Sequence, residues 1–178
     1  VPDYLQGIGA GIAGMVIGVI RDLGPDAPSM QPDTRANLEA MEAVLEDLGA
    51  RLVEISLPAP LSGYRQIVGA INWGESYSIH ERDFLERADL MGKALRDKMT
   101  AGFTMRAVDY IAAQRRRREL AQSTDAVLSA CDAVLAPCTF LTAPTFDDQE
   151  TLTKFTFGAA TSIFNATGHP ALSICNGF

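Results

Sequence analysis

The sequence has little positive charge, few cysteines and few aromatic residues. Its 178 residues include 15 Lys and Arg against 22 Asp and Glu, a net charge of −7, and 3 of the basic residues are lysines. Because phosphate affinity depends on clustered positive charge, nucleic acid is not an expected partner. The 3 cysteines are an odd number in a chain long enough to build its own core, which indicates reduced thiols in a cytoplasmic protein.

The sequence also lacks a membrane segment and a cofactor motif. The glycine-rich uncharged stretch Leu5–Ile20 has 16 residues, fewer than the roughly 18 that a membrane helix needs. Gly9–Gly14 matches G-x-G-x-x-G by letter, but it precedes a strand, whereas a dinucleotide site requires these glycines after one. No C-x-x-C or H-x-x-x-H pair occurs to hold a metal. We therefore expect no membrane association and no cofactor.

What is present is the alternation of strands and helices typical of an α/β protein. Apolar runs predict strands at Met15–Ile20, Arg51–Leu57, Asp132–Pro137 and Ala171–Ile174. Helical spacing predicts helices at Pro32–Leu48, Tyr64–Phe84, Asp89–Thr100, Arg106–Ala130 (with Thr104 as its cap) and Thr153–Ala166. This order predicts a single α/β domain over residues 1–178, with a mixed, mostly buried sheet covered by helices.

The residues alone do not assemble into a complete catalytic group. His80 stands in a helix beside acidic residues and His169 stands at a turn, and no G-x-S-x-G turn presents a serine to either. Cys138 follows a strand, where α/β enzymes place reactive groups, but no activating base is evident, which favours a structural thiol. The arginines of 115–118 point to all sides of a helix, so we expect two to face solvent and one or two to pair with acids.

Five stretches carry motifs that occur in the same order in one known family. Phe164–Phe178 is similar to F-N-x-T-G-x-P-A-L-S-x-P-x-G-F, and Asp109–Leu120 is similar to D-Y-x-x-A-x-x-x-R-x-x-L. The other matches are Asp132–Pro137 with Ala143–Pro144, Gly14 with Gly18–Arg21, and Glu75 and His80 with Gly92 and Gly102. Together they cover nearly all of the chain, which resembles the later half of the amidase signature enzymes.

The resemblance implies a larger α/β/α fold and the hydrolysis of amides by a Lys–Ser–Ser triad, with a Gly/Ser-rich signature that stabilises the oxyanion. This sequence has no Gly-Gly-Ser, and its lysines are Lys93, Lys98 and Lys154. The first residue is Val1 and not methionine, which fits a piece of a longer polypeptide. We therefore expect the carboxy-terminal portion of an amidase, which completes the fold and the acyl pocket for a small-molecule amide and supplies no catalytic residue.

The resemblance also suggests which residues form the wall of the acyl pocket, namely Cys138, Phe140, Phe157 and Gly158. Gly158 stands where the A subunits of tRNA amidotransferases carry an acid for the ammonium group of glutamine, and Asp97–Lys98 replaces their basic pair. Both departures favour a general amidase with a less polar acyl group. Two alternatives stay open: a portion of the A subunit of a glutamine-dependent tRNA amidotransferase, and a non-catalytic binding or scaffold module.

The strands lead to one further expectation. Met15–Ile20 and Asp132–Pro137 are apolar enough to be covered on both faces, yet the chain offers few other strands to pair with them. Uncovered sheet edges and apolar patches favour association between molecules. We therefore expect the isolated chain to self-associate.

Overall fold

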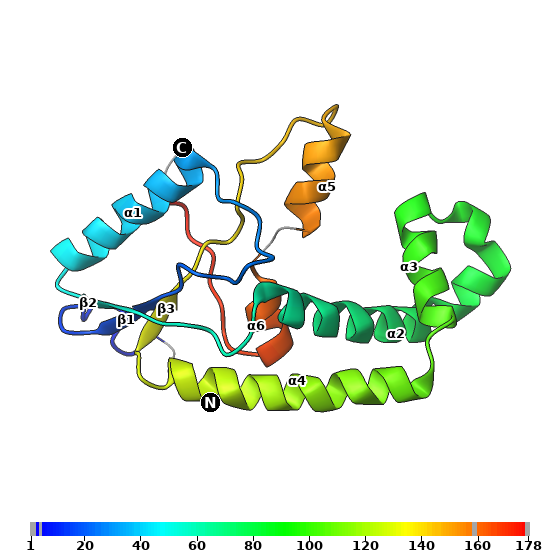
Figure 1. Cartoon of the computed structure of the whole chain (residues 1–178), viewed down its shortest axis with the longest axis horizontal. Helices are drawn as coiled ribbons and strands as arrows, with labels where there is room; N and C mark the ends of the chain where they lie inside the picture. Colours follow the sequence, from blue (N-terminus) through cyan, green and yellow to red (C-terminus); the bar gives the residue numbers. More distant parts are fainter. Residues whose placement is uncertain (1–2, 4, 158–159, 177–178) are drawn as a thin grey trace.

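Three parallel strands form a small sheet at one end of the molecule (Figure 1). The computed structural model describes residues 3, 5–157 and 160–176, with the backbone alone at 154, 156 and 157. Its strands lie in the order β2-β1-β3, where β1 is Val16–Val19, β2 is Arg51–Glu54 and β3 is Ala133–Leu135. The expected α/β class is confirmed, and all strand pairs in the described residues are parallel.

The central strand β1 is well covered, as expected from its apolar sequence. Ile17 and Val19 expose 6% and 0% of their surface. Gly18 is required by close packing, because a Cβ there would lie 2.8 Å from Ile55 Cδ1 and 2.9 Å from Cys131 Sγ. The side chains of Ile55 and Cys131 therefore close over the strand where Gly18 leaves room for them.

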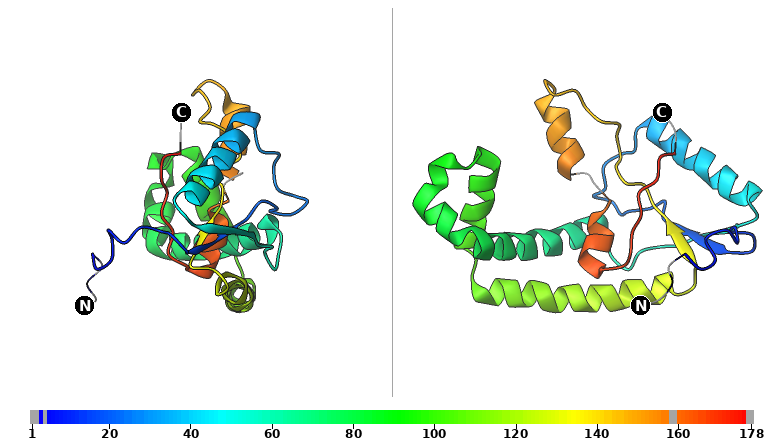
Figure 2. Two further views of the ribbon diagram at one scale, coloured as in Figure 1. Left: turned by 90° about the vertical axis from the view of Figure 1, so that its left-hand side faces the viewer. Right: turned by 180° about the vertical axis from the view of Figure 1, so that it is seen from behind.

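The flanks of the sheet differ from expectation. In β3, Ala133 is exposed while Val134 and Leu135 are half-buried, so this apolar strand is only partly covered. The expected fourth strand, Ala171–Ile174, is wrong, because these residues form neither helix nor strand. They form an irregular segment after the last helix (Figures 1 and 2).

Helix α1, Pro32–Asp47, connects β1 to β2 and begins where the sequence predicts, ending one residue earlier than expected. Pro32 stands in the first turn, where its missing N–H is not needed. Gly49, with φ of +89°, follows the helix in the left-handed conformation that ends many helices. Leu38 is buried, whereas Leu48 is 57% exposed, so the apolar stripe of α1 is only partly covered.

Three helices form an arm that extends away from the sheet (Figures 1 and 2). Helices α2 and α4 lie side by side, and α3 with the short 3₁₀ helix η1 lies at the far end. The four elements are α2 Leu61–Arg87, η1 Ala88–Leu90, α3 Lys93–Phe103 and α4 Ala107–Leu128. Helix α2 runs unbroken for 27 residues and is longer at both ends than the sequence predicts.

Two helix boundaries predicted from the sequence are wrong. Thr104 does not cap α4; it ends α3, where its Oγ1 donates to Thr100 O at 3.0 Å, and Arg106 takes the cap position of α4. The hydroxyl of Thr104 therefore faces backward into α3. The single helix expected over Thr153–Ala166 is divided, and the two helices are α5 Gln149–Phe157 and α6 Ser162–Thr167.

The hydrophobic core lies where the sheet meets α2, α4 and α6. Its buried members are Ile20, Leu23, Leu61, Tyr64, Ile67, Leu120, Phe140, Ala160, Ile163 and Ala166. Much of the molecule lies outside this core, since the accessible surface is 11682 Å². A folded monomer of this mass exposes about 8,400 Å². No helix of the described residues is both long enough and apolar enough to cross a membrane.

The contact between α2 and α3 provides a test of the fold. A Cβ at Gly102 would lie 2.4 Å from Trp73 O and 2.5 Å from Tyr77 Cβ. Gly102→Ala must therefore push α3 away from α2, and we predict a loss of about 2–3 kcal/mol in the free energy of unfolding by urea. The matched control is Gly69→Ala in α2, where the nearest atom is 3.8 Å away. There alanine should gain about 0.5–1 kcal/mol, and an equal loss in both variants would contradict the packing.

Candidate functional site

The carboxy end of α6 is held by an arginine from α4. Gly168 ends α6 with φ of +81°, and its N–H donates to Phe164 O at 2.8 Å. The Nε of Arg117 donates to Ala166 O at 2.9 Å. Since the last carbonyls of a helix have no partner within the helix, Arg117 satisfies one of them and fixes α6 against α4. Two stretches that resemble family motifs, Asp109–Leu120 and Phe164–Phe178, thus meet through this hydrogen bond.

A second contact between the same elements lies at His169. Its Nδ1 is 2.9 Å from Thr167 Oγ1, and its Nε2 is 3.4 Å from Asp125 Oδ1 on α4. Thr167 Oγ1 also donates to Ile163 O at 2.9 Å. The turn after α6 is therefore oriented by α4 at two places, Arg117 and Asp125, and His169 has a structural position as expected.

Helix α4 is joined to α2 by a buried hydrogen bond. Tyr64 Oη and Thr124 Oγ1 are 2.8 Å apart, and both side chains are fully buried. Thr124 is the buried polar residue of the described core. Burial raises the pKa of the Tyr64 hydroxyl, and the hydrogen bond to Thr124 partly opposes this. The pair satisfies two polar groups that would be costly if left alone in the core.

A groove of about 340 Å³ opens where α2, α4 and α6 meet. Its apolar lining comes from Ile67, Val68, Ile71 and Ala166, and its polar lining from Asn72, Glu75, Arg117 and Asn165. The polar side chains are exposed, so they form the rim of the groove. Glu75, Arg117 and Asn165 belong to three different motif stretches, and folding brings them to one place.

A second pocket, of about 360 Å³, adjoins the groove and shares Glu75 with it. Tyr110 Oη donates to Glu75 Oε1 at 3.0 Å, and Gln114 Nε2 donates to Tyr110 Oη at 2.8 Å. These bonds hold the carboxylate of Glu75 between the two pockets. The pocket is lined by Gly74, Glu75, Ser78, Gly102, Met105, Arg106, Ala107 and Tyr110.

These groups can bind a polar ligand, but they do not form a proton-transfer relay. No lysine or histidine of the described residues lines either pocket. The hydroxyl of Ser78 donates to Glu75 O at 2.7 Å within the helix, so no base activates it. Among the described residues, no group of three or more His, Cys, Asp or Glu side chains is placed to hold a metal ion.

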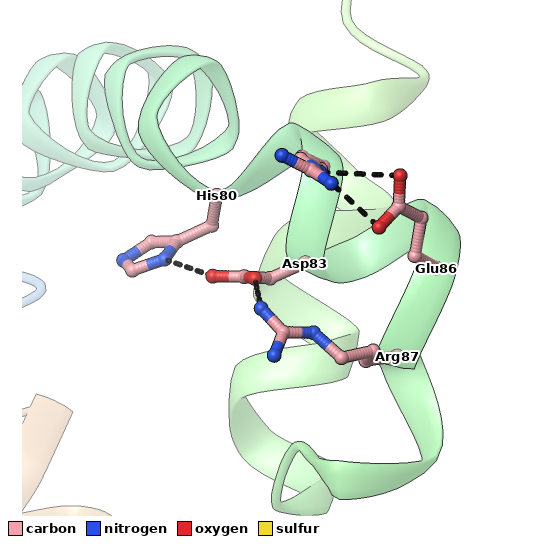
Figure 3. A network of polar contacts seen from close by, with 5 residues as sticks. His80, Asp83, Glu86 and Arg87 are labelled. Carbon is pink, nitrogen blue, oxygen red and sulfur yellow. Dashed lines mark hydrogen bonds and ion pairs between the residues drawn. The ribbon is translucent and has the colours of Figure 1, made fainter.

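His80 belongs to a surface network and lines neither pocket. Its Nδ1 is 3.8 Å from Asp83 Oδ2, and Asp83 also pairs with Arg87 one turn later (Figure 3). The hydrogen bond from Arg87 lowers the pKa of the Asp83 carboxyl. Arg82 and Glu86 form a second pair along the same helix. Exposed pairs of this kind support a helix slightly, which agrees with the expected surface position of His80.

The four arginines of α4 separate as expected. Arg116 pairs with Glu119 at 3.1 Å, and Arg117 reaches the carbonyl of Ala166. Arg115 and Arg118 are exposed and have no ion-pair partner in the described part of the chain. The run therefore forms no single basic stripe on the helix.

The residues predicted to form the acyl pocket lie apart from both pockets where the structure describes them. Cys138 is exposed after β3, and its carbonyl accepts from Ala160 N at 3.1 Å. Phe140 is 3% exposed and packs in the core. Phe157 is the last residue of α5, and its side chain lies outside the described residues, as does Gly158. A role of these residues in an acyl pocket stays a prediction.

The rim of the groove was not foreseen from the sequence. Asn72 carries no motif signal, whereas Glu75, Arg117 and Asn165 were recognised only as motif letters. The sequence signal that could have indicated the rim is the presence of a polar residue in each of three motif stretches whose other residues form apolar stripes. Which helix faces meet is a property of the tertiary fold and could not be obtained from spacing.

Solved structures with this arrangement of elements include amidases. A bacterial aryl acylamidase of the amidase signature family superposes with a TM-score of 0.76 over 95% of this chain and 38% of its own, at 16% identity. At that identity the likeness shows the fold alone. The fold is therefore that of the amidase signature enzymes.

The chain belongs to the Amidase family, which it matches over residues 3–178. An amidase of Pseudomonas putida is 27% identical over 191 residues, covering 100% of this chain and 39% of the relative. The A subunit of the glutamyl-tRNA(Gln) amidotransferase of Synechococcus sp. (strain CC9902) is 43% identical over 58 residues, covering 33% of this chain and 12% of the relative. The chain thus spans about two fifths of the length of the amidase. The resemblance found in the motifs is confirmed.

The Tyr64–Thr124 bond can be tested by a double-mutant cycle. Tyr64→Phe and Thr124→Val each leave one buried hydroxyl without its partner, and each should cost about 1–3 kcal/mol. The double variant should lose less than the sum of the two, with a coupling of about 1 kcal/mol. Additive losses in urea unfolding would contradict the bond.

The stability difference between the wild type and Tyr64→Phe should depend on pH. The pKa of Tyr64 is raised in the folded state, so the folded protein holds this proton more tightly than the unfolded chain. Its contribution to stability is present below the unfolded pKa of about 10 and is lost as the pH rises through the folded value. Tyr64→Phe should therefore lose less stability than the wild type between pH 9 and pH 11, roughly.

The hydrogen bond from Arg117 to α6 can be tested with its neighbour as control. Arg117→Met keeps much of the apolar stem and removes the donor to Ala166 O, which should cost about 1–2 kcal/mol. Hydrogen exchange at residues 165–169 should quicken in this variant. Arg118→Met, on the exposed side of the same helix, should change neither quantity. Equal effects at both positions would show that Arg117 does not hold α6.

Proposed function

We propose that this chain is the carboxy-terminal portion of an amidase that hydrolyses carbon–nitrogen bonds in small-molecule amides. The support is the family match over residues 3–178 together with the share of the relative that it covers, 39%. In this proposal the chain completes the sheet and shapes the acyl pocket. The bond-breaking residues come from polypeptide outside these 178 residues.

The chemistry of the described pockets is the observation that supports placing the bond-breaking residues outside this chain. They present a carboxylate, two guanidiniums and two carboxamides, which bind and orient, but no lysine that could remove a proton from a serine. The mechanism proposed for the whole enzyme is that of the family. A neutral lysine takes the proton of a nucleophilic serine through a bridging serine, the serine oxygen attacks the amide carbonyl, and the amine leaves with a proton. Water then releases the acid from the acyl-serine.

The proposed substrate has an acyl group that is less polar than glutamine. Gly158, which lies outside the described residues, replaces an acid that the A subunits of tRNA amidotransferases carry, and glycine cannot pair with an ammonium group. Cys138, Phe140, Phe157 and Gly158 remain the proposed pocket wall. We further propose a cytoplasmic enzyme, in keeping with its odd number of cysteines.

The second candidate is a portion of the A subunit of a glutamine-dependent tRNA amidotransferase. It is favoured by the 43% identity over 58 residues to one such protein, against 27% over the whole chain to the amidase. It predicts that a longer protein containing this sequence releases ammonia from glutamine. The general amidase instead predicts release from apolar amides, such as benzamide, in preference to glutamine.

The proposal is tested with the purified 178-residue chain and a serine-directed fluorophosphonate probe. We predict no labelled serine and no ammonia released from benzamide, acetamide or glutamine, because in this proposal the catalytic lysine and both catalytic serines belong to polypeptide outside these residues. The P. putida amidase, treated in parallel, is the positive control. Labelling of a serine in this chain, or hydrolysis by it, would show that the catalytic machinery lies within these residues.

A further inference from the structure

Two opposite charges line the groove between α2, α4 and α6 without pairing with each other. Glu75 and Arg117 both belong to its lining, yet neither forms an ion pair with any group of the described residues. Exposed charges elsewhere on these helices do pair, as Arg116 does with Glu119 at 3.1 Å. The groove therefore keeps a carboxylate and a guanidinium available to a third group.

Both charges are held in place by neutral partners. Tyr110 Oη donates to Glu75 Oε1 at 3.0 Å, which leaves Glu75 Oε2 without a hydrogen-bond partner in the described part of the chain. Arg117 Nε donates to Ala166 O at 2.9 Å, and the other N–H groups of its guanidinium have no acceptor among the described residues. Side chains that are oriented in advance lose less conformational freedom when a ligand binds.

Each charge has a carboxamide near it. Asn72 stands three residues before Glu75 in α2, so the two side chains share one face of that helix. Asn165 directly precedes Ala166, whose carbonyl Arg117 reaches. The carboxylate and carboxamide oxygens of α2 can accept hydrogen bonds from a cation, and the guanidinium and carboxamide N–H groups opposite can donate to an anion.

The rest of the lining is aliphatic. Ile67 and Ala166 are buried, while Val68 and Ile71 are half-buried. The groove volume of about 340 Å³ is that of a small-molecule pocket, for which roughly 300–1,000 Å³ is usual. A docked protein ordinarily covers a far wider face, of about 800 Å². The groove therefore suits a small ligand that carries both charges on an apolar body.

We propose that this groove binds a zwitterionic α-amino acid with an aliphatic side chain. The ammonium group of the amino acid binds the oxygens of Glu75 and Asn72. Its carboxylate binds the N–H groups of Arg117 and Asn165, and its side chain packs on the aliphatic lining. The amino acid is a ligand and not a substrate, because the described pockets hold no activated nucleophile. The proposal goes beyond the proposed function and does not depend on it.

The test titrates the purified chain with L-leucine and with two analogues that each keep one charge. These are 4-methylpentanoate, which lacks the ammonium group, and 3-methylbutylamine, which lacks the carboxylate. Calorimetry should show that each analogue binds at least about tenfold more weakly than leucine, because hydrogen bonds to a charged group are lost. Leucine should also shift the backbone NMR signals of residues 67–75 and 165–168. An absence of leucine binding, equal binding of either analogue, or shifts confined to other residues would overturn the proposal.

Glu75→Gln tests the ammonium contact alone, since glutamine can still accept from Tyr110 but carries no charge. The variant should bind leucine at least about tenfold more weakly and bind 4-methylpentanoate as the wild type does. A general loss of structure would weaken both. The matched control is Glu86→Gln on the same helix, where the carboxylate pairs with Arg82 and lines neither pocket. It should change neither affinity, and equal effects of the two variants would contradict the assignment of Glu75.

A longer protein that contains this sequence distinguishes a ligand from covering polypeptide. It should bind leucine with the same ranking of analogues, because the groove stays open in this proposal. Loss of binding there would show that polypeptide fills the groove, and the proposal would be wrong. No measurement in this series involves hydrolysis, so its outcome is separate from that of the proposed amidase function.

Discussion

The seating of α4 against α2 and α6 is the contact on which the rest of the structure depends. One face of α4 presents Arg117, Leu120 and Thr124, at spacings of three and four residues. Leu120 packs in the core, Thr124 bonds to Tyr64 of α2, and Arg117 bonds to the end of α6. A single helix face thus satisfies apolar, neutral polar and charged contacts. Helix α6 has only six residues, and its packing against α4 and α2 holds it in place.

That helix seating builds a core at one end of the molecule and leaves the other parts thinly covered. The core is shared by the sheet and the near ends of α2 and α4, while the arm carries α3 beyond it (Figure 1). Parallel strands are ordinarily covered on both faces and paired on both sides. Here only β1 meets that condition among the described strands. The large accessible surface is the consequence.

The sequence predicts elements better than it predicts their neighbours. The apolar run of β1, the proline and glycine at the ends of α1, and the long α4 were recovered because each is a local signal. Ala171–Ile174 was expected to be a strand on the same local grounds, but a strand requires a partner backbone, which no local signal supplies. Phe140 is a proposed pocket residue on the family resemblance alone, and no local signal showed that it packs in the core. The direction of an apolar side chain in a loop is decided by what packs against it.

The candidate site also depends on tertiary packing that the sequence does not predict, and that packing explains the spacing of the motif residues. Arg117 and Asn165 are far apart in sequence, and the packing of α6 against α4, together with the Arg117–Ala166 bond, brings them to one groove. The spacing of Asp109, Arg117 and Leu120 places these residues near one face of α4. The Phe164–Gly168 stretch covers most of α6 and its cap, and α6 packs against that face. The motif residues in this chain therefore include residues that make structural contacts between helices. Residues that hold shape and residues that transfer protons need not share a stretch of sequence, because only the folded site must bring them together.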